Sequence, residues 1–269
     1  MSDNNLKERD SSKPSLKNGE KNIIPGASRM RYYPIFADLN GRPVVVIGGG
    51  VVAERKVASL LSAGAEITIV SPRLTKALRA LADGGRVRTL KRKYRNGDLM
   101  GASLAVSASD RKDVNTAVRK EADSRSILLN VVDDPRLCDF IVPSVVDRGD
   151  LVVAISTSGQ FPALAKKLRK DIEKAIGTEY EYFTLILGEA RKILLKRGES
   201  HVKKKSVIKA LLDSEIPEMI KAERLDDIDA LLKRLLGKDC GFTRLGLSHK
   251  LRLGQQKSAE IRPRRSSKG

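Results

Sequence analysis

The sequence predicts a doubly wound α/β domain, in which a parallel sheet carries helices on both faces. Three observations predict it. Short runs of β-branched residues alternate with segments whose apolar residues recur at helical spacing. The first of these runs, 44–47, is unbroken, as in a strand that is covered on both faces. A triple glycine separates the first run from the first helical segment. Strands that alternate with helices at this spacing imply a parallel sheet with right-handed crossovers.

The elements of the sheet follow in chain order. The first strand is predicted at 44–47, and the helix behind the glycines ends at Gly64, a residue type that suits the left-handed end of a helix. The apolar residues of that helix share one face: Ala53, Val57, Leu60 and Leu61. Further strands are predicted at 66–70, 87–90, 104–107 and 127–129, and further helices at 74–81 and about 113–123.

The pattern changes after Ser144. One more strand is predicted at 151–155, followed by a basic helix that begins at Pro162. From Tyr180 to Gly237 the apolar spacing is helical. We therefore expect an α/β domain over 31–142, a connecting region over 143–177 and a helical domain over 178–242. The polar composition of 1–30 predicts a disordered arm, and 243–269 forms a basic tail.

Composition and charge exclude several classes of protein. The chain has 269 residues with 52 Lys and Arg against 33 Asp and Glu, a formal net charge of +19. Two cysteines cannot form a disulfide framework and favour a cytoplasmic location. No apolar run is long enough to cross a membrane, and the first residues do not resemble a secretory signal. Residues 31–242 keep a net charge of +10, which favours a polyanionic ligand or partner.

The glycine turn is the strongest motif for ligand binding. Gly48 and Gly50 followed by Ala53, between a strand and a helix, match the dinucleotide-binding fingerprint of a Rossmann-like domain. Such a turn lets the backbone approach a pyrophosphate at the helix N-terminus. The alternative is a tight turn that binds nothing. The next strand ends in Ser71, Pro72 and Arg73 without the usual carboxylate, which leaves the choice between NAD and NADP open.

A second cluster of polar residues follows the strand at 127–129. Asp133 or Asp134 could accept a proton from a bound substrate at this strand end, but Asp-Asp-Pro is also ordinary turn chemistry. Cys138 is expected to be a small buried hydrophobe within 137–142, without a catalytic role. The two histidines, His201 and His249, lie too far apart in the sequence for a metal site, so no metal ligands are assigned.

Four blocks of sequence, in this order, resemble the siroheme synthase N-terminal module family. They are Tyr33-Pro34-Ile35-Phe36 with Leu39 and then VVIGGGVVAERK from Val45; Asn130-Val131-Val132-Asp133; Phe140-Ile141-Val142-Pro143-Ser144; and Val153-Ala154-Ile155-Ser156-Thr157-Ser158-Gly159. The resemblance covers about residues 33–200. It implies NAD-dependent oxidation of precorrin-2 to sirohydrochlorin, in some members followed by ferrous iron insertion. The chain has no room for the methyltransferase domain that other members carry, so it resembles the stand-alone form.

The resemblance also implies particular site residues. The cofactor turn would comprise Gly48, Gly49, Gly50, Val51 and Val52, with further cofactor contacts at Ser71, Pro72, Ser107 and Ser109. Asp133 would be the general acid/base, and Asp134 would remain a turn residue. Arg136, Lys166 and Arg169 are expected, from position alone, to contact the carboxylates of precorrin-2 or sirohydrochlorin. The family forms homodimers, which makes 143–177 a dimerisation region with 151–155 as the exchanged strand.

Two other functions are compatible with the residues. A Rossmann domain that senses nucleotide without turnover would need the glycine turn but not Asp133. A nucleic-acid contact through 243–269 is disfavoured because aromatic residues, which stack on bases, make up 4% of the chain. No membrane partner is expected.

Overall fold

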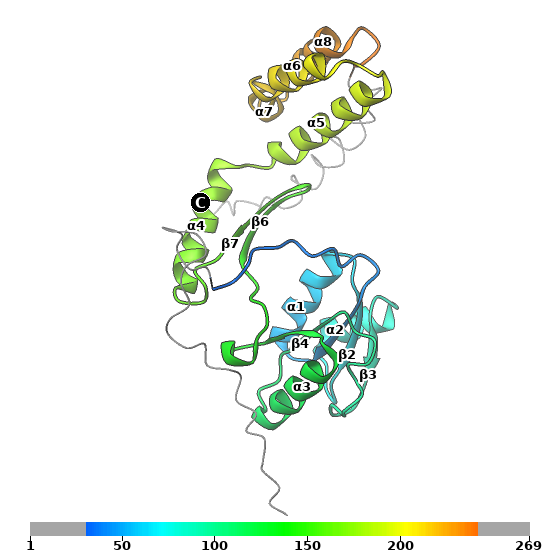
Figure 1. Cartoon of the computed structure of the whole chain (residues 1–269), viewed down its shortest axis with the longest axis vertical. Coiled ribbons are helices and arrows are strands. Elements are labelled where there is room, and N and C mark those ends of the chain that lie inside the picture. Colours follow the sequence, from blue (N-terminus) through cyan, green and yellow to red (C-terminus); the bar gives the residue numbers. More distant parts are fainter. Residues whose placement is uncertain (1–30, 242–269) are drawn as a thin grey trace, which may run out of the picture. The chain divides into compact units, whose positions relative to one another are not determined.

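The computed structural model describes residues 31–241, and Figure 1 labels most of their helices and strands. The described chain forms two compact units, divided between Leu128 and Leu129. The arm expected over 1–30 and the basic tail over 243–269 lie outside the described residues. Within residues 31–241, no helix is long and apolar enough to span a bilayer.

The predicted parallel sheet is confirmed. Its strands are β1 (Pro43–Ile47), β2 (Glu66–Val70), β3 (Arg88–Leu90), β4 (Leu104–Ser107) and β5 (Leu128–Val131), in the spatial order β3-β2-β1-β4-β5. β1 is central, with Val44 opposite Ile67 of β2 on one side and opposite Leu104 of β4 on the other. Four of the five β1 residues are buried, which explains why this strand is continuously apolar.

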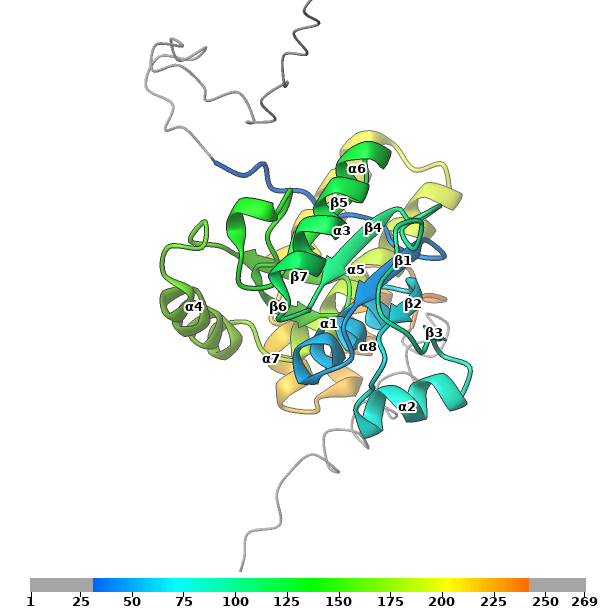
Figure 2. The ribbon, with the colours of Figure 1, turned by 90° about the horizontal axis from the view of Figure 1, so that it is seen from below.

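Three helices complete the first unit: α1 (Val51–Ser62), α2 (Lys76–Asp83) and α3 (Lys112–Arg125). The chain winds outward from β1 to β3 and then returns to β4, so right-handed crossovers place α3 on the opposite face from α1 (Figure 2). Gly64 has a φ of +76° and donates its N–H to the Leu61 carbonyl, which confirms it as the glycine that ends α1. α2 begins two residues later than predicted because the Thr75 hydroxyl caps it, accepting the Leu78 N–H at 3.2 Å.

The second unit contains a hairpin that the sequence only half predicts. β6 (Ser144–Arg148) and β7 (Leu151–Ile155) are antiparallel neighbours, with Val146 opposite Val153. We expected β7 alone. β6 buries only Val146 and ends in Asp147 and Arg148, so its own sequence carries little strand pattern, and pairing with β7 defines it. α4 (Pro162–Ala175) follows, starting at Pro162 as predicted.

The region after α4 is helical, as expected. It comprises α5 (Glu179–Lys196), α6 (His201–Leu212), α7 (Ile216–Lys221) and α8 (Leu225–Leu236). These helices share one apolar core, whose fully buried residues include Ile186, Ala190, Leu211, Ile216, Ile228 and Leu232. Burial of a Leu or Ile side chain contributes about 1.5–3 kcal/mol, so this core suffices to hold four short helices together.

Candidate active site

The glycine turn after β1 adopts a conformation that requires glycine at its first position. Gly48 has a φ of +115°, and its N–H donates to the Val70 carbonyl at 3.0 Å. A Cβ at Gly48 would lie 2.5 Å from the Ala108 carbonyl oxygen, closer than carbon and oxygen can approach. The turn is therefore held between the ends of β2 and β4, with no room for a side chain at this point.

Gly49 packs directly on the loop between β2 and α2. A Cβ here would lie 2.1 Å from the Arg73 carbonyl oxygen and 2.8 Å from the Ser71 hydroxyl. The Gly49 carbonyl accepts the Thr75 N–H at 2.9 Å, which ties the two loops together. Gly49 thus acts as a packing glycine.

Gly50 faces open space instead. It occupies the N-cap position of α1 without a side-chain cap, and a Cβ built on it would meet no described atom within 4 Å. Val51 beside it is 69% exposed. An uncapped helix N-terminus next to a residue without a side chain is a suitable site for an anionic group. The helix dipole and the backbone N–H groups favour negative charge there. The first unit therefore fits the pyrophosphate of a dinucleotide at Gly50–Val52.

Thr75 and Glu54 support this turn, and the sequence analysis missed both. The Thr75 hydroxyl donates to the Glu54 carboxylate at 2.6 Å while capping α2. One threonine therefore joins the first turn of α1 to the start of α2. A Thr three residues before the apolar Leu78 is a recognisable capping signal, whereas the link to Glu54, 21 residues away, requires the fold.

The predicted cofactor contacts at the end of β2 differ in exposure. The Ser71 side chain is buried, and its hydroxyl donates to the Arg73 carbonyl at 2.7 Å. Its oxygen can still accept a hydrogen bond. Pro72 and Arg73 are exposed. Ser71 therefore shapes this loop, and Pro72 and Arg73 form its outer surface.

The two serines after β4 have separate positions. Ser107 is fully buried and donates to the Asn115 side-chain oxygen at 2.7 Å. The Asn115 amide donates to the Ser109 carbonyl at 3.1 Å, and the Ser109 hydroxyl accepts the Arg111 N–H at 3.2 Å. Ser107 thus braces the loop from inside through Asn115, a residue that the sequence analysis did not select. Ser109 lies in the loop between β4 and α3.

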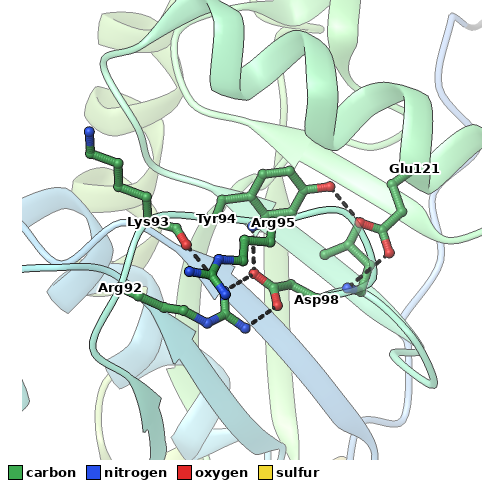
Figure 3. Close-up of polar contacts among 7 residues, drawn as sticks. Arg92, Lys93, Tyr94, Arg95, Asp98 and Glu121 are labelled. Atoms are coloured by element: carbon green, nitrogen blue, oxygen red, sulfur yellow. Dashed lines mark hydrogen bonds and ion pairs between the residues drawn. The ribbon is translucent and has the colours of Figure 1, made fainter.

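The connection from β3 to β4 is fixed by two buried carboxylates (Figure 3). Asp98 receives both terminal nitrogens of Arg92, at 2.8 and 2.6 Å, and the backbone N–H of Arg95 at 2.8 Å. Although burial alone would raise it, the pKa of Asp98 lies below its usual value because of these donors. Charge-assisted hydrogen bonds to Asp98 therefore stabilise the connection between β3 and β4.

Glu121 of α3 anchors the other end of this connection. Its carboxylate accepts the Tyr94 hydroxyl (Figure 3) and the Leu99 N–H at 3.2 Å. It also accepts the Arg125 guanidinium at 2.9 Å. Burial, with the bond to Glu121, raises the pKa of Tyr94 far above its ordinary value. The cluster is structural, because each of its charges is matched within the first unit.

In the second unit, Asp133 lies in the turn directly after β5. Its backbone is left-handed, with a φ of +62°, and its side chain is exposed. Asp134 is a turn residue, as expected. Its side chain accepts the Arg136 N–H at 3.2 Å and pairs with the Arg136 guanidinium at 3.1 Å. Arg136 is thus held beside Asp134, and its side chain is 88% exposed.

The prediction that 137–142 is a buried segment is wrong. Cys138 is only half-buried, and Val142 is 48% exposed. The Cys138 thiol is surrounded by polar backbone groups, including the Val131 carbonyl at 3.2 Å, so it is no simple hydrophobe. The apolar letters of this segment suggested a core, but the chain here runs along the surface before β6.

The two basic residues predicted on α4 have different surroundings. Lys166 is exposed. Arg169 is half-buried and pairs with Glu173 one turn later. The structure thus gathers the predicted cofactor residues around the glycine turn of the first unit. In the second unit, Asp133 and Arg136 share one turn, and Lys166 and Arg169 share one helix. Within residues 31–241, no three His, Cys, Asp or Glu side chains meet as a metal site.

Two family models match the chain. One, described as NAD(P)-binding, covers residues 35–144, and the other, described as the central part of a sirohaem biosynthesis protein, covers residues 148–175. The first match contains the whole glycine turn. The domain over 35–144 is thus an NAD(P)-binding domain, and the nicotinamide dinucleotide predicted from the sequence is confirmed as the class of cofactor.

Curated relatives carry the name siroheme synthase. The chain is 45% identical over 168 residues to the protein of Methylobacillus flagellatus, covering 62% of this chain and 36% of the relative. It is 39% identical over 207 residues to siroheme synthase 1 of Pectobacterium atrosepticum, covering 77% of this chain and 43% of the relative. The chain thus spans about two fifths or less of the length of these two relatives.

A solved structure matches this chain over nearly the whole length of the solved protein. The structure of SirC, named as a precorrin-2 dehydrogenase, superposes with a TM-score of 0.65 at 27% identity, covering 76% of this chain and 98% of SirC. The sheet, the small antiparallel hairpin and the helical region of this chain agree with that fold. Taken together with the two matching family models, the resemblance predicted from the four sequence blocks is confirmed: over residues 35–175 the chain resembles the siroheme synthase N-terminal module family.

Proposed function

We propose that this protein is an NAD-dependent precorrin-2 dehydrogenase, which oxidises precorrin-2 to sirohydrochlorin. The observation that carries the proposal is the match to SirC, which covers nearly the whole of that dehydrogenase at 27% identity. The glycine turn supports it independently, because an uncapped α1 N-terminus next to open space suits a dinucleotide.

The roles of the chain's own residues follow from their positions. Bound NAD would supply the hydride acceptor. The backbone of Gly50–Val52 would hold its pyrophosphate, with Gly48 and Gly49 shaping the turn, and the exposed Pro72 and Arg73 would border its ribose. Asp133, an exposed carboxylate just beyond the end of β5, would take the proton that leaves precorrin-2 as the hydride departs. Most of the rate would come from orienting the two reactants.

The charge of the protein suits this substrate. Precorrin-2 bears acetate and propionate groups, and the chain has a net charge of +19. Exposed Lys166 is available for such a carboxylate, whereas Arg136 and Arg169 would have to exchange Asp134 and Glu173 for it. Lys166 is therefore the strongest of the three candidates for substrate binding.

The protein would act as a homodimer in the cytoplasm. Of the 14 residues of α4 only Ala165 is buried, while Leu164 and Leu168 remain 45% and 38% exposed. The β6–β7 hairpin adds Val145 and Val152, at 41% and 37% exposure. A second copy would cover this apolar surface. The cytoplasmic location rests on the cysteine content, because two cysteines cannot form a disulfide framework.

Anaerobic incubation of the full chain with fresh precorrin-2 and NAD tests the proposal, followed by the absorbance of sirohydrochlorin. Product that appears only with NAD supports the dehydrogenase, and Asp133→Ala should abolish most turnover while NAD binding persists. Ferrous iron added afterwards tests iron insertion: sirohydrochlorin must disappear faster than without enzyme. Nucleotide binding with no product, from either NAD or NADP, would instead indicate a nucleotide-sensing module.

A further inference from the structure

The turn that carries Asp133 lies beyond the end of β5 and is closed by both backbone and side-chain bonds, starting with the Asp134 N–H, which donates to the Val131 carbonyl at 3.4 Å. Beyond Val131, the last residue of β5, the chain leaves the strand and returns along residues 138–140. The Asp139 N–H donates to the Leu129 carbonyl at 2.8 Å, and its carboxylate accepts the Leu129 N–H at 3.0 Å. Residues 129–139 thus form a closed loop, with Asp133 near its tip.

The Cys138 thiol bonds to backbone groups on both sides of Asp133. Its sulfur accepts the Val131 N–H at 3.2 Å and lies 3.2 Å from the Val131 carbonyl and 3.3 Å from the Asp134 carbonyl. A thiol carries one proton, so it donates to one of the two carbonyls at a time. These two backbone positions lie on either side of Asp133 in the turn. The thiol therefore bridges the strand end and the residue that follows Asp133.

Asn130 holds the thiol from the other side. Its amide nitrogen donates to the Phe140 carbonyl at 3.0 Å and lies 3.6 Å from the Cys138 sulfur. Asn130 itself is buried. The loop beyond β5 is thus fixed by a buried amide and a half-buried thiol, both acting on backbone groups.

Asp133 needs such support. Its φ of +62° places a non-glycine residue in the left-handed region, which is disfavoured and persists only where the surroundings impose it. An exposed carboxylate on an unsupported turn would sample many positions, whereas proton transfer in a bound complex requires a narrow one.

We propose that Cys138 and Asn130 are positioning residues that set the place of the Asp133 carboxylate for proton transfer. The inference rests on the proposed function, since it assumes that Asp133 takes a proton from the substrate. Cys138 does not touch substrate in this account. It acts through the backbone on both sides of Asp133.

The first test compares Cys138→Ala with Cys138→Ser in the full chain, using Cys240→Ala as a control. Cys240 is also buried beside polar groups, with its sulfur 3.0 Å from an Arg197 nitrogen, but it lies in the helical core. Cys138→Ala should lower kcat at least ~10-fold because the carboxylate is misplaced, with the NAD dissociation constant within ~2-fold of wild type. Cys138→Ser keeps a donor and an acceptor and should recover most of the rate. Cys240→Ala should keep kcat.

The second test measures the effect of Cys138→Ala in a protein that already carries Asp133→Ala. If Cys138 acts through Asp133, adding Cys138→Ala to Asp133→Ala should slow the residual rate no further. An equal loss in both backgrounds, or an unchanged kcat in Cys138→Ala, would overturn the proposal. Asn130→Asp, which keeps the shape but replaces the amide donor, should show the same dependence on Asp133.

Hydrogen exchange provides a readout that needs no turnover. Amides of 129–140 should exchange at least ~10-fold faster in Cys138→Ala, and those of the helical core should not. If the amides of 129–140 exchange as slowly in Cys138→Ala as in the wild type, the thiol does not stabilise this loop. A wild type without turnover, together with faster exchange in the variant, would overturn the dehydrogenase and the positioning role while leaving the loop closure intact. If Cys138→Ala does not fold, Cys138→Ser and Asn130→Asp carry both measurements.

Discussion

The α-carbon of Gly49 lies against the carbonyl oxygen of Arg73, so closely that a methyl group on it would come within 2.1 Å of that oxygen. Neither Gly49 nor Arg73 can move away easily, because the contact is with the backbone of Arg73. The hydrogen bond from the Thr75 N–H to the Gly49 carbonyl also holds the two loops together. This contact fixes the glycine turn to the loop that follows β2.

Gly49→Ala should therefore damage the fold, whereas Gly50→Ala should damage mainly ligand binding. At Gly49 the clash must shift backbone, at a cost of about 1–3 kcal/mol in the free energy of unfolding. Gly50 has an ordinary φ of −85° and open space, so its alanine should cost less than about 1 kcal/mol. Denaturant unfolding measures the first effect, and NAD titration should show weaker binding for both. Equal stability of the two variants would contradict this account.

The pair of Arg92 and Asp98 makes the first unit sensitive to acid. Because the pKa of Asp98 is lowered in the folded state, its contribution to stability is complete above the unfolded value and is lost as pH falls through the folded one. Asp98→Asn should thus be less stable at neutral pH and should lose less stability on acidification than the wild type. Unfolding midpoints between pH 7 and pH 2 measure this. Parallel curves for the two proteins would exclude the pair as a source of acid sensitivity.

Removal of the Glu121 carboxylate should cost more than removal of any one of its partners. Glu121→Ala leaves the Leu99 N–H and the Tyr94 hydroxyl without an acceptor, with an expected loss of about 3–5 kcal/mol. Tyr94→Phe removes only one donor and should cost about 0.5–1.5 kcal/mol. The ratio of the two losses, from denaturant unfolding, is the measurement. A larger loss for Tyr94→Phe would show that ring packing dominates.

Arg148 should be needed for the second unit to hold α4. Its guanidinium donates to the Ile176 carbonyl at 2.9 Å and to the Glu173 carbonyl at 3.3 Å, so a β6 side chain caps the C-terminal end of α4. Arg148→Ala should lower the unfolding free energy by about 1.5–3 kcal/mol, and Arg148→Lys, which cannot reach both carbonyls with one planar group, should recover only part. Arg191→Ala, on the exposed side of α5, is the control and should change little. Hydrogen exchange of 171–177 locates the effect.

A charge on the bare face of α4 should separate the proposed dimer. Leu164→Asp and Leu168→Asp each place a carboxylate on the surface that a second copy would cover, and light scattering should then give half the wild-type mass. Leu212→Asp on α6 starts from a comparable exposure of 56% and should keep the mass unchanged. A wild type that is already monomeric would refute the dimer.

The sequence alone determined the elements whose own residues carry the pattern. The largely buried strands β1, β2 and β4 were predicted within one residue, as was the glycine that ends α1, because buried strands and a left-handed helix end each demand particular residue types. The helical region after α4 was equally predictable from its spacing of apolar residues. Glycine at 48 and 50, followed by Ala53, sufficed to indicate a nucleotide-binding turn.

Only the tertiary structure decided what depends on a distant partner. β6 is a strand because β7 lies beside it, and Cys138 is a hydrogen-bonded thiol because the chain folds back on Val131. Ser107 turns inward because Asn115, at the start of a helix, offers it an acceptor. In each case the residue's own neighbours allow more than one environment. The environment that forms is stabilised by groups that become adjacent only on folding. The pattern of residue types along the chain does not indicate which groups these are.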